Sequence, residues 1–319
     1  MTLCAGWMLA GLYLDGWAHR HFQNLETFFT PWHGALYSGF LALLVCLAWM
    51  LVHFRRPGEP WWQAIPPGYG LSLVGAAVFL AGGLGDLVWH TLLGIEVDLE
   101  ALLSPTHLLL AIGGTLMGAG PFRAAWRRPT DGAAGLTDLL PMLFSLTFGW
   151  SVLTFFTQFA HPFVHPAAEG AMPANPLQLQ RIELAAILLQ SAIMTGLMLL
   201  ATWRWALPFG SLTIVLTLNA LLMSALEMHF YFVRVGLIAG VAADLLVRWL
   251  MPSTHASPRF RWFAALLPAT FYATYFLAVI WLAGTWWPVP LWTGAIVMAG
   301  IVGWLLSYLL LPPGRPLPR

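Results

Sequence analysis

Long apolar stretches are the feature that most limits what this chain can fold into. Roughly ten of them approach the ~20 residues that a helix needs to cross the hydrocarbon core of a bilayer. Charged residues make up only 8% of the chain, whereas a soluble domain carries about 25%. The sequence therefore predicts an all-α, polytopic integral membrane helical bundle. The expected spans are residues 1–18, 33–54, 70–90, 105–122, 137–159, 182–204, 208–230, 233–250, 262–284 and 290–311.

We expect a single transmembrane domain over residues 1–311, followed by a proline-rich cytoplasmic tail at residues 312–319. Within that domain, residues 1–56 and 70–128 are predicted to form two copies of a helical hairpin. Residues 137–311 make up the remainder of the bundle.

The placement of the basic residues predicts the orientation of the bundle. All fourteen are arginines, and only Arg20, Arg181 and Arg234 fall on one side of the membrane. Because cytoplasmic loops are enriched in Lys and Arg, the side with the other arginines is expected to be cytoplasmic. Both termini then lie in the cytoplasm, as in a multi-pass protein of the cytoplasmic membrane.

Charge and cysteine content exclude several kinds of protein. The net charge of +1 gives no basic surface for nucleic acid. The two cysteines, Cys4 and Cys46, both lie in apolar runs, so neither a disulfide framework nor a CxxC metal motif is available. Because the chain is predicted to span a membrane, the lipid bilayer is its first expected partner.

One polar motif occurs twice in this apolar chain. In its first copy, Asp15 precedes His19 by four positions and Glu26 precedes His33 by seven. The second copy has Asp86, His90, Glu100 and His107 at the corresponding positions. Under the predicted orientation, both copies lie at the extracytoplasmic side of the bundle.

The spacing brings the side chains of each copy together. Residues i and i+4 share a helix face, so each Asp and the His that follows it point to one place. Thr30 and Ser104 are expected as N-caps of the returning helices, each with a proline at the first helical position. His33 and His107 then lie in the first helical turn, where the helix dipole disfavours a protonated ring.

Two imidazoles and a carboxylate at one place predict a metal site. Copper is the expected metal, with iron and zinc as alternatives, and two metals are possible because the motif is doubled. Glu26 and Glu100 are candidate ligands, or hydrogen-bond acceptors that orient an imidazole. A metal ion is therefore the second expected partner.

Other polar residues allow further interpretations. Asp15 could instead pair with Arg20, and the glutamates could simply face water. His229 is a weaker candidate ligand, with a buried, hydrogen-bonded histidine as the alternative. His161 and His165 are candidate ligands or access-loop residues, and otherwise solvated loop histidines.

The Asp-x3-His pattern followed by a helix-starting His resembles the copper motif in the C subunit of the copper membrane monooxygenases, which oxidise methane and ammonia. Thirteen residues separate His19 from His33 and sixteen separate His90 from His107, whereas the family's spacer is about a dozen. The resemblance covers only these short stretches and implies that the Asp and His residues of both copies are copper ligands. The chain departs from the family in carrying the motif twice and in adding Glu26 and Glu100. It also resembles bacterial polytopic membrane proteins that carry LDGWAH and ETFFTPWH, which implies a bacterial inner membrane and no particular activity.

Three functions compete on these grounds. The first is a metalloenzyme, a copper- or iron-dependent membrane oxidoreductase with monooxygenase-like activity. The second is a metal-ion permease, although the spans offer few polar steps for a conduction path. The third is a metal-delivery protein, which would act with a membrane or periplasmic protein partner.

Overall fold

The computed structural model describes residues 1–22, 28–58, 60–61, 64–94, 98–128, 134–252 and 257–311. Helices make up the regular structure of these residues, with one isolated β-bridge between Glu169 and Thr285. The helices are α1 (Thr2–His21), α2 (Pro31–Phe54), α3 (Gly70–Leu93), α4 (Asp98–Leu103), α5 (Pro105–Gly118), α6 (Gly120–Trp126), α7 (Leu136–Phe156), η2 (Gln158–Ala160), α8 (Pro176–Arg204), α9 (Ser211–Leu226), α10 (Phe232–Leu250), α11 (Ser257–Leu282) and α12 (Val289–Leu310). The expected all-α class is confirmed.

Six helices are long and apolar enough to cross a membrane, namely α2, α3, α7, α8, α11 and α12. The pair α5 and α6 is bent by 44° and makes a seventh span if it is counted as one. Helix α9 is apolar but has only 16 residues, and α1 and α10 are not among the candidate spans. A multi-pass helical membrane protein is thus supported, whereas the full number of ten spans and the orientation stay predictions.

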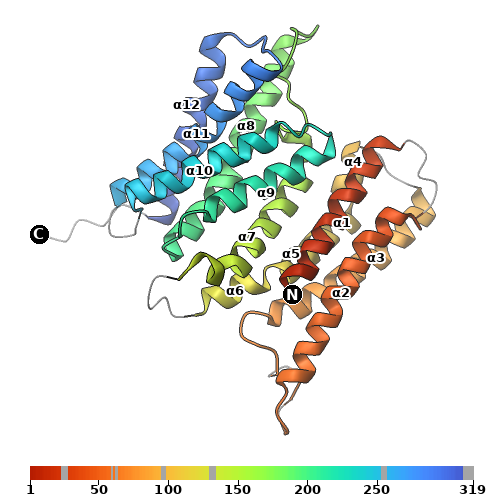
Figure 1. Cartoon of the computed structure of the whole chain (residues 1–319). Coiled ribbons are helices and arrows are strands. Elements are labelled where there is room, and N and C mark those ends of the chain that lie inside the picture. The colour runs from red at the N-terminus through yellow and green to blue at the C-terminus, as the bar shows by residue number, and fades with distance from the viewer. Residues whose placement is uncertain are drawn as a thin grey trace, which may run out of the picture. The chain divides into compact units, whose positions relative to one another are not determined.

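The described residues divide into two compact units. The first unit contains α1 to α7 and the short segment Ala225–Met228. In it, α1 packs along α2 and α3 packs along α5, so that two helical hairpins stand in the part drawn red to yellow in Figure 1. Helix α7 contacts the first hairpin through the Tyr13 hydroxyl on α1, which donates to the Ser151 carbonyl oxygen at 2.8 Å.

Glycines allow close packing at equivalent positions of the two hairpins. A Cβ atom on Gly11, four residues before Asp15, would lie 2.7 Å from the backbone of Leu36. A Cβ atom on Gly82, four residues before Asp86, would lie 3.0 Å from the backbone of Leu110. Gly39 and Gly113 approach the facing helices in the same way, with 2.5 Å to the backbones of Met8 and Phe79. The helix axes can therefore lie close enough for the histidine of one helix to meet the aspartate of the other.

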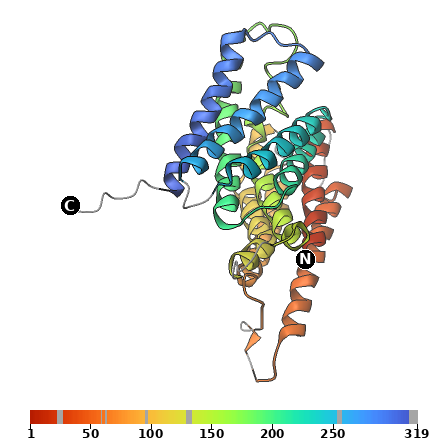
Figure 2. The same ribbon diagram turned by 60° about the vertical axis from the view of Figure 1, so that its left-hand side comes forward.

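The second unit contains α8 to α12. Helix α11 packs against α10, α12 and α8, and the α11–α12 pair runs side by side in both views (Figures 1 and 2). The buried carboxylate of Asp244 on α10 accepts hydrogen bonds from the backbone N–H groups of Gly210, Leu212 and Thr213 at the start of α9. This carboxylate satisfies N–H groups that a helix start leaves without an intrahelical partner.

Candidate metal centre

The start of each returning helix positions one histidine. The Thr30 hydroxyl accepts a hydrogen bond from the backbone N–H of His33 at 3.1 Å, and the Ser104 hydroxyl accepts from that of His107 at 3.4 Å. Each helix begins with a proline directly after its cap. The predicted N-caps are therefore confirmed, and both histidines lie in the first helical turn.

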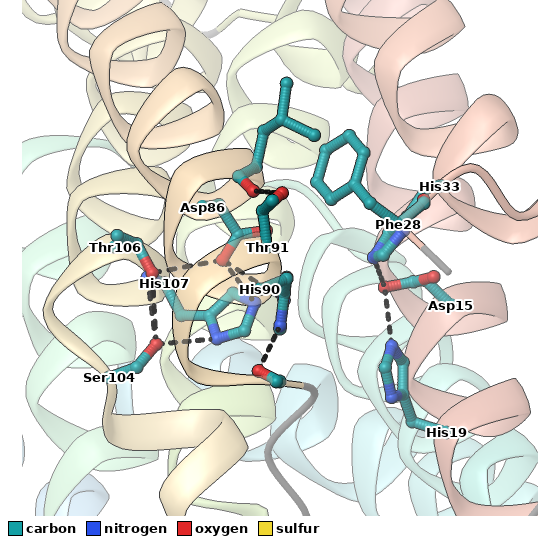
Figure 3. Close-up of polar contacts among 12 residues, drawn as sticks. Asp15, His19, Phe28, His33, Asp86, His90, Thr91, Ser104, Thr106 and His107 are labelled. Atoms are coloured by element: carbon teal, nitrogen blue, oxygen red, sulfur yellow. Dashed lines mark hydrogen bonds and ion pairs between the residues drawn. The ribbon is translucent and has the colours of Figure 1, made fainter. Parts of the chain in front are cut away.

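The first hairpin brings Asp15, His19 and His33 together. Asp15 Oδ2 lies 3.4 Å from His33 Nε2 and 3.8 Å from His19 Nε2 (Figure 3). Their exposed side-chain fractions are 14% for Asp15, 8% for His33 and 25% for His19. The group thus lies mostly below the surface, with His19 as its most exposed member.

The second hairpin brings Asp86, His90 and His107 together in the same way. Asp86 Oδ1 lies 3.4 Å from His90 Nε2 and 3.3 Å from His107 Nε2 (Figure 3). This group is buried more deeply, since only 1% of the Asp86 side chain is exposed. Within each group, the candidate ligand atoms all lie within 4.8 Å of one another.

These nitrogen–oxygen separations fit a cation held between the side chains. A tetrahedral metal with bonds of about 2.0–2.2 Å holds its ligand atoms about 3.3–3.6 Å apart. Three of the four measured aspartate–histidine distances, 3.3, 3.4 and 3.4 Å, lie in that range, and the fourth is 3.8 Å. Direct hydrogen bonds between nitrogen and oxygen are usually shorter, at about 2.7–3.2 Å.

The contacts of Nδ1 in His33 and His90 indicate whether Nε2, the nitrogen that faces the aspartate, carries a proton. His33 Nδ1 lies 2.6 Å from the Phe28 carbonyl oxygen, and His90 Nδ1 lies 3.2 Å from that of Gly94. A carbonyl oxygen only accepts, so Nδ1 carries the proton in both rings. In a neutral ring, Nε2 then presents its lone pair to a carboxylate oxygen, and two acceptors face each other. A cation between them relieves this repulsion, and backbone carbonyls orient metal-bound histidines in the same manner.

For His107, a chain of hydroxyl groups orients the ring through its Nδ1 atom. Its Nδ1 lies 2.8 Å from the Ser104 hydroxyl, which lies 3.2 Å from the Thr106 hydroxyl. Thr106 in turn donates to Asp86 Oδ1 at 3.0 Å. Because the carboxylate can only accept, a consistent chain runs from His107 Nδ1–H through both hydroxyls to Asp86.

Among the described residues, the first group has no such donor. Trp32 occupies the position that corresponds to Thr106. Asp15 Oδ1 is buried, and no hydrogen-bond partner for it exists within the described parts of the chain. Leaving a buried carboxylate oxygen unpaired is costly, so this atom also favours a bound cation.

The two groups are neighbours within the first unit. The ring centroids of His33 and His90 lie 6.5 Å apart, and the Phe28 ring is 4.9 Å from the former and 6.3 Å from the latter. Figure 3 shows the two groups on their separate hairpins with Phe28 beside His33.

Of the remaining predicted site residues, Glu100 and His229 belong to neither group. Glu26 falls outside the described residues. Glu100 is exposed on the short helix α4 and belongs to neither group. His229 lies in the second unit, where its Nδ1 is 3.2 Å from the Phe163 carbonyl oxygen. Arg20, the alternative partner considered for Asp15, donates hydrogen bonds to Glu227 and Gln158.

The sequence allows His161 to be a solvated loop histidine if it is not a ligand or an access-loop residue. In the structure it is not solvated. It is buried in the second unit, and its Nδ1 accepts a hydrogen bond from the Phe163 N–H at 3.1 Å. Burial, together with the neighbouring His165, lowers the pKa of His161 to about 3. Its ring is therefore neutral at physiological pH, whereas His165 is exposed.

The sequence interpretation missed the residues that surround the ligands. Thr106 differs from its counterpart Trp32 in polarity, and that difference in an otherwise similar motif was the available signal. The carbonyl groups of Phe28 and Gly94 could not be found from residue type, because every residue carries one.

No protein-family model, curated protein or solved structure is significantly similar to this chain. The geometry of the two groups therefore carries the functional argument.

Proposed function

We propose that this protein is a membrane metalloprotein that binds one transition-metal ion in each Asp-His-His group. The first site consists of Asp15, His19 and His33, and the second consists of Asp86, His90 and His107. The proposed location is the extracytoplasmic side of a bacterial cytoplasmic membrane.

The observation that carries the proposal is that, in both groups, a histidine Nε2 atom faces a carboxylate oxygen. His33 and His90 each place Nε2 3.4 Å from a carboxylate oxygen and Nδ1 at hydrogen-bond distance from a backbone carbonyl oxygen. In a neutral ring that donates through Nδ1, Nε2 directs its lone pair at the carboxylate. A protonated ring beside each carboxylate is the competing explanation. Its cost rises with burial, and four histidines and two carboxylates are gathered here in one small volume.

Copper is the proposed metal, with iron and zinc as alternatives. Imidazole and carboxylate ligands suit all three, and divalent copper binds such donor sets most tightly of the first-row ions. Three protein ligands leave a coordination position open for a small molecule, as catalytic metal sites do. Since copper and iron change oxidation state, we propose an oxidoreductase with monooxygenase-like activity.

Elemental analysis of the protein purified without added metal tests the sites directly. We expect two metal ions per chain, and His33→Ala and His107→Ala should each remove about one because each deletes one of three ligands. His53→Ala is the matched control, since His53 lies in the last turn of α2 and far along the helix from His33. Unchanged metal content in both ligand variants would overturn the proposal.

Two functional assays then separate the activities. Oxygen consumption that persists in detergent and disappears in the ligand variants supports the oxidoreductase. Metal flux into sealed vesicles without oxygen consumption would overturn it in favour of a permease.

A further inference from the structure

Glu183 is a buried carboxyl group that the proposed metal sites do not use. It lies on α8, one of the helices that are long and apolar enough to cross a membrane, and only 2% of it is exposed. Seven residues separate it from Pro176, where the helix begins, which is about 10 Å along the helix axis. An ionisable group in such a place is costly to bury and commonly marks a functional site.

Two donors from different parts of the second unit hold this carboxyl group. The backbone N–H of Ala167, in the loop before α8, donates to Glu183 Oε2 at 2.8 Å. The Tyr275 hydroxyl on α11 donates to Glu183 Oε1 at 2.7 Å. Each oxygen atom therefore has one hydrogen-bond partner.

No Arg or His forms an ion pair with Glu183 among the residues that the structure describes. Arg181, two positions earlier on α8, is exposed and lies on another face of the helix. Helix α12 also packs against α8, and its one titratable residue, Tyr308, lies near its C-terminal end. The titratable groups that act electrostatically on Glu183 are the side chains of Glu169 in the loop, Tyr231 before α10, and Tyr272 and Tyr275 on α11.

Of these side chains, only a carboxylate is normally charged at neutral pH, and its charge is negative. An ionised Glu183 would thus be buried without a counter-ion and near a like charge. A neutral carboxylic acid avoids both costs.

A metal ion is the other ligand that a buried carboxylate can take. Within the described part of the chain, Glu183 belongs to no group of side chains that could complete a coordination sphere. Both of its oxygen atoms also face N–H or O–H donors, whose hydrogen atoms a cation would repel. These contacts favour a proton over a metal ion.

We propose that Glu183 binds one proton reversibly, taken from the solution at the end of the bundle where the loop with Ala167 lies. Hydronium gives the proton to Oε1 and leaves water, because Oε2 already accepts from an N–H group. A tyrosine hydroxyl both donates and accepts, so the Tyr275 hydroxyl turns and accepts from the new acid group. The same positions of the heavy atoms therefore serve both states. The site goes beyond the proposed metal binding and does not depend on it.

Infrared spectroscopy of the full chain in lipid nanodiscs tests the site. The C=O stretch of a protonated carboxyl group is separate from the bands of ionised carboxylates, and isotope-labelled glutamate distinguishes Glu from Asp. We expect one glutamic acid per chain to be protonated at neutral pH. Its band should disappear as the pH is raised, because the proton then leaves, and it should shift in heavy water.

Two variants assign the band to this site. Glu183→Gln should abolish it, and this variant should fold because an amide can accept from Ala167 and donate to Tyr275 as the acid does. Tyr275→Phe should instead move the band to higher frequency, because the acid loses a hydrogen-bond partner.

Glu169→Gln is the matched control. Glu169 lies two residues after Ala167, is only half-buried, and accepts a hydrogen bond from the Tyr231 hydroxyl at 2.6 Å. Its replacement should leave the band in place. Loss of the band in this variant and not in Glu183→Gln would assign the proton to Glu169 and overturn the proposal.

Two further outcomes would overturn it. Absence of a glutamic acid band at neutral pH in the parent would show that Glu183 stays ionised. A band that never shifts in heavy water would show a permanently trapped proton. None of these measurements involves a metal, so their result is separate from that of the elemental analysis.

Discussion

At the scale of single residues, the two metal groups differ in how their carboxylates are held. Asp86 is 1% exposed and accepts a hydrogen bond from Thr106, whereas Asp15 is 14% exposed and Trp32 stands where a hydroxyl could. A hydrogen bond to a ligating carboxylate fixes its orientation before the metal arrives. The second group is therefore the better organised of the two.

Replacing Thr106 tests this role. Thr106→Val keeps the shape of the side chain and removes the donor to Asp86, so the metal affinity of the second group should fall about 10- to 100-fold. Isothermal titration of metal-stripped His33→Ala protein, in which only the second group is intact, measures this affinity.

Thr91→Val is the control for that measurement. The Thr91 hydroxyl is exposed and donates to the Leu87 carbonyl oxygen of its own helix, so its loss should leave the metal affinity within twofold. An equal loss of affinity in the two variants would contradict the role assigned to Thr106.

At the scale of elements, the hairpins depend on glycines that let two helices touch. Gly11→Ala would place a methyl group 2.7 Å from the Leu36 backbone, which lies three residues after His33. Because α2 must move away, His33 should separate from Asp15, and the first group should lose its metal. The measurement is metal content per chain, which should fall by about half if both sites fill in the parent protein.

Gly6→Ala on the same helix is the matched control, since a methyl group there meets no atom within 4 Å. It should retain the metal content of the parent. Loss of metal in Gly6→Ala as well would show that α1 tolerates no added methyl group and would remove the argument from close packing.

The helix starts at the site were predictable, but its surroundings were not. The sequence Thr30-Pro31 and its counterpart Ser104-Pro105 specify a cap and a first helical residue through local chemistry alone. The i, i+4 spacing likewise predicts which histidine lies beside which aspartate on one helix. Helix α4 and the Gly94 carbonyl that contacts His90 lie in a connection whose shape depends on tertiary packing, so residue type does not reveal them.

At the scale of the whole molecule, orientation in the membrane is the main prediction that residue contacts leave untested. The arginine distribution predicts cytoplasmic termini. A C-terminal green fluorescent protein fusion should therefore fluoresce, and a C-terminal alkaline phosphatase fusion should be inactive. Phosphatase fused after Ala174, in a loop expected on the outside, should be active, and the reverse pattern would contradict the orientation.

The closeness of the two hairpins has a consequence for how ions load. The ring centroids of His33 and His90 lie 6.5 Å apart, and among the described residues each group contains one aspartate as its only carboxylate. A divalent ion in one group leaves a net charge of +1, which repels a second divalent ion across a poorly screened interior. On the proposed function, the two sites therefore fill with negative cooperativity, and a half-loaded protein persists over a wide range of ion concentration.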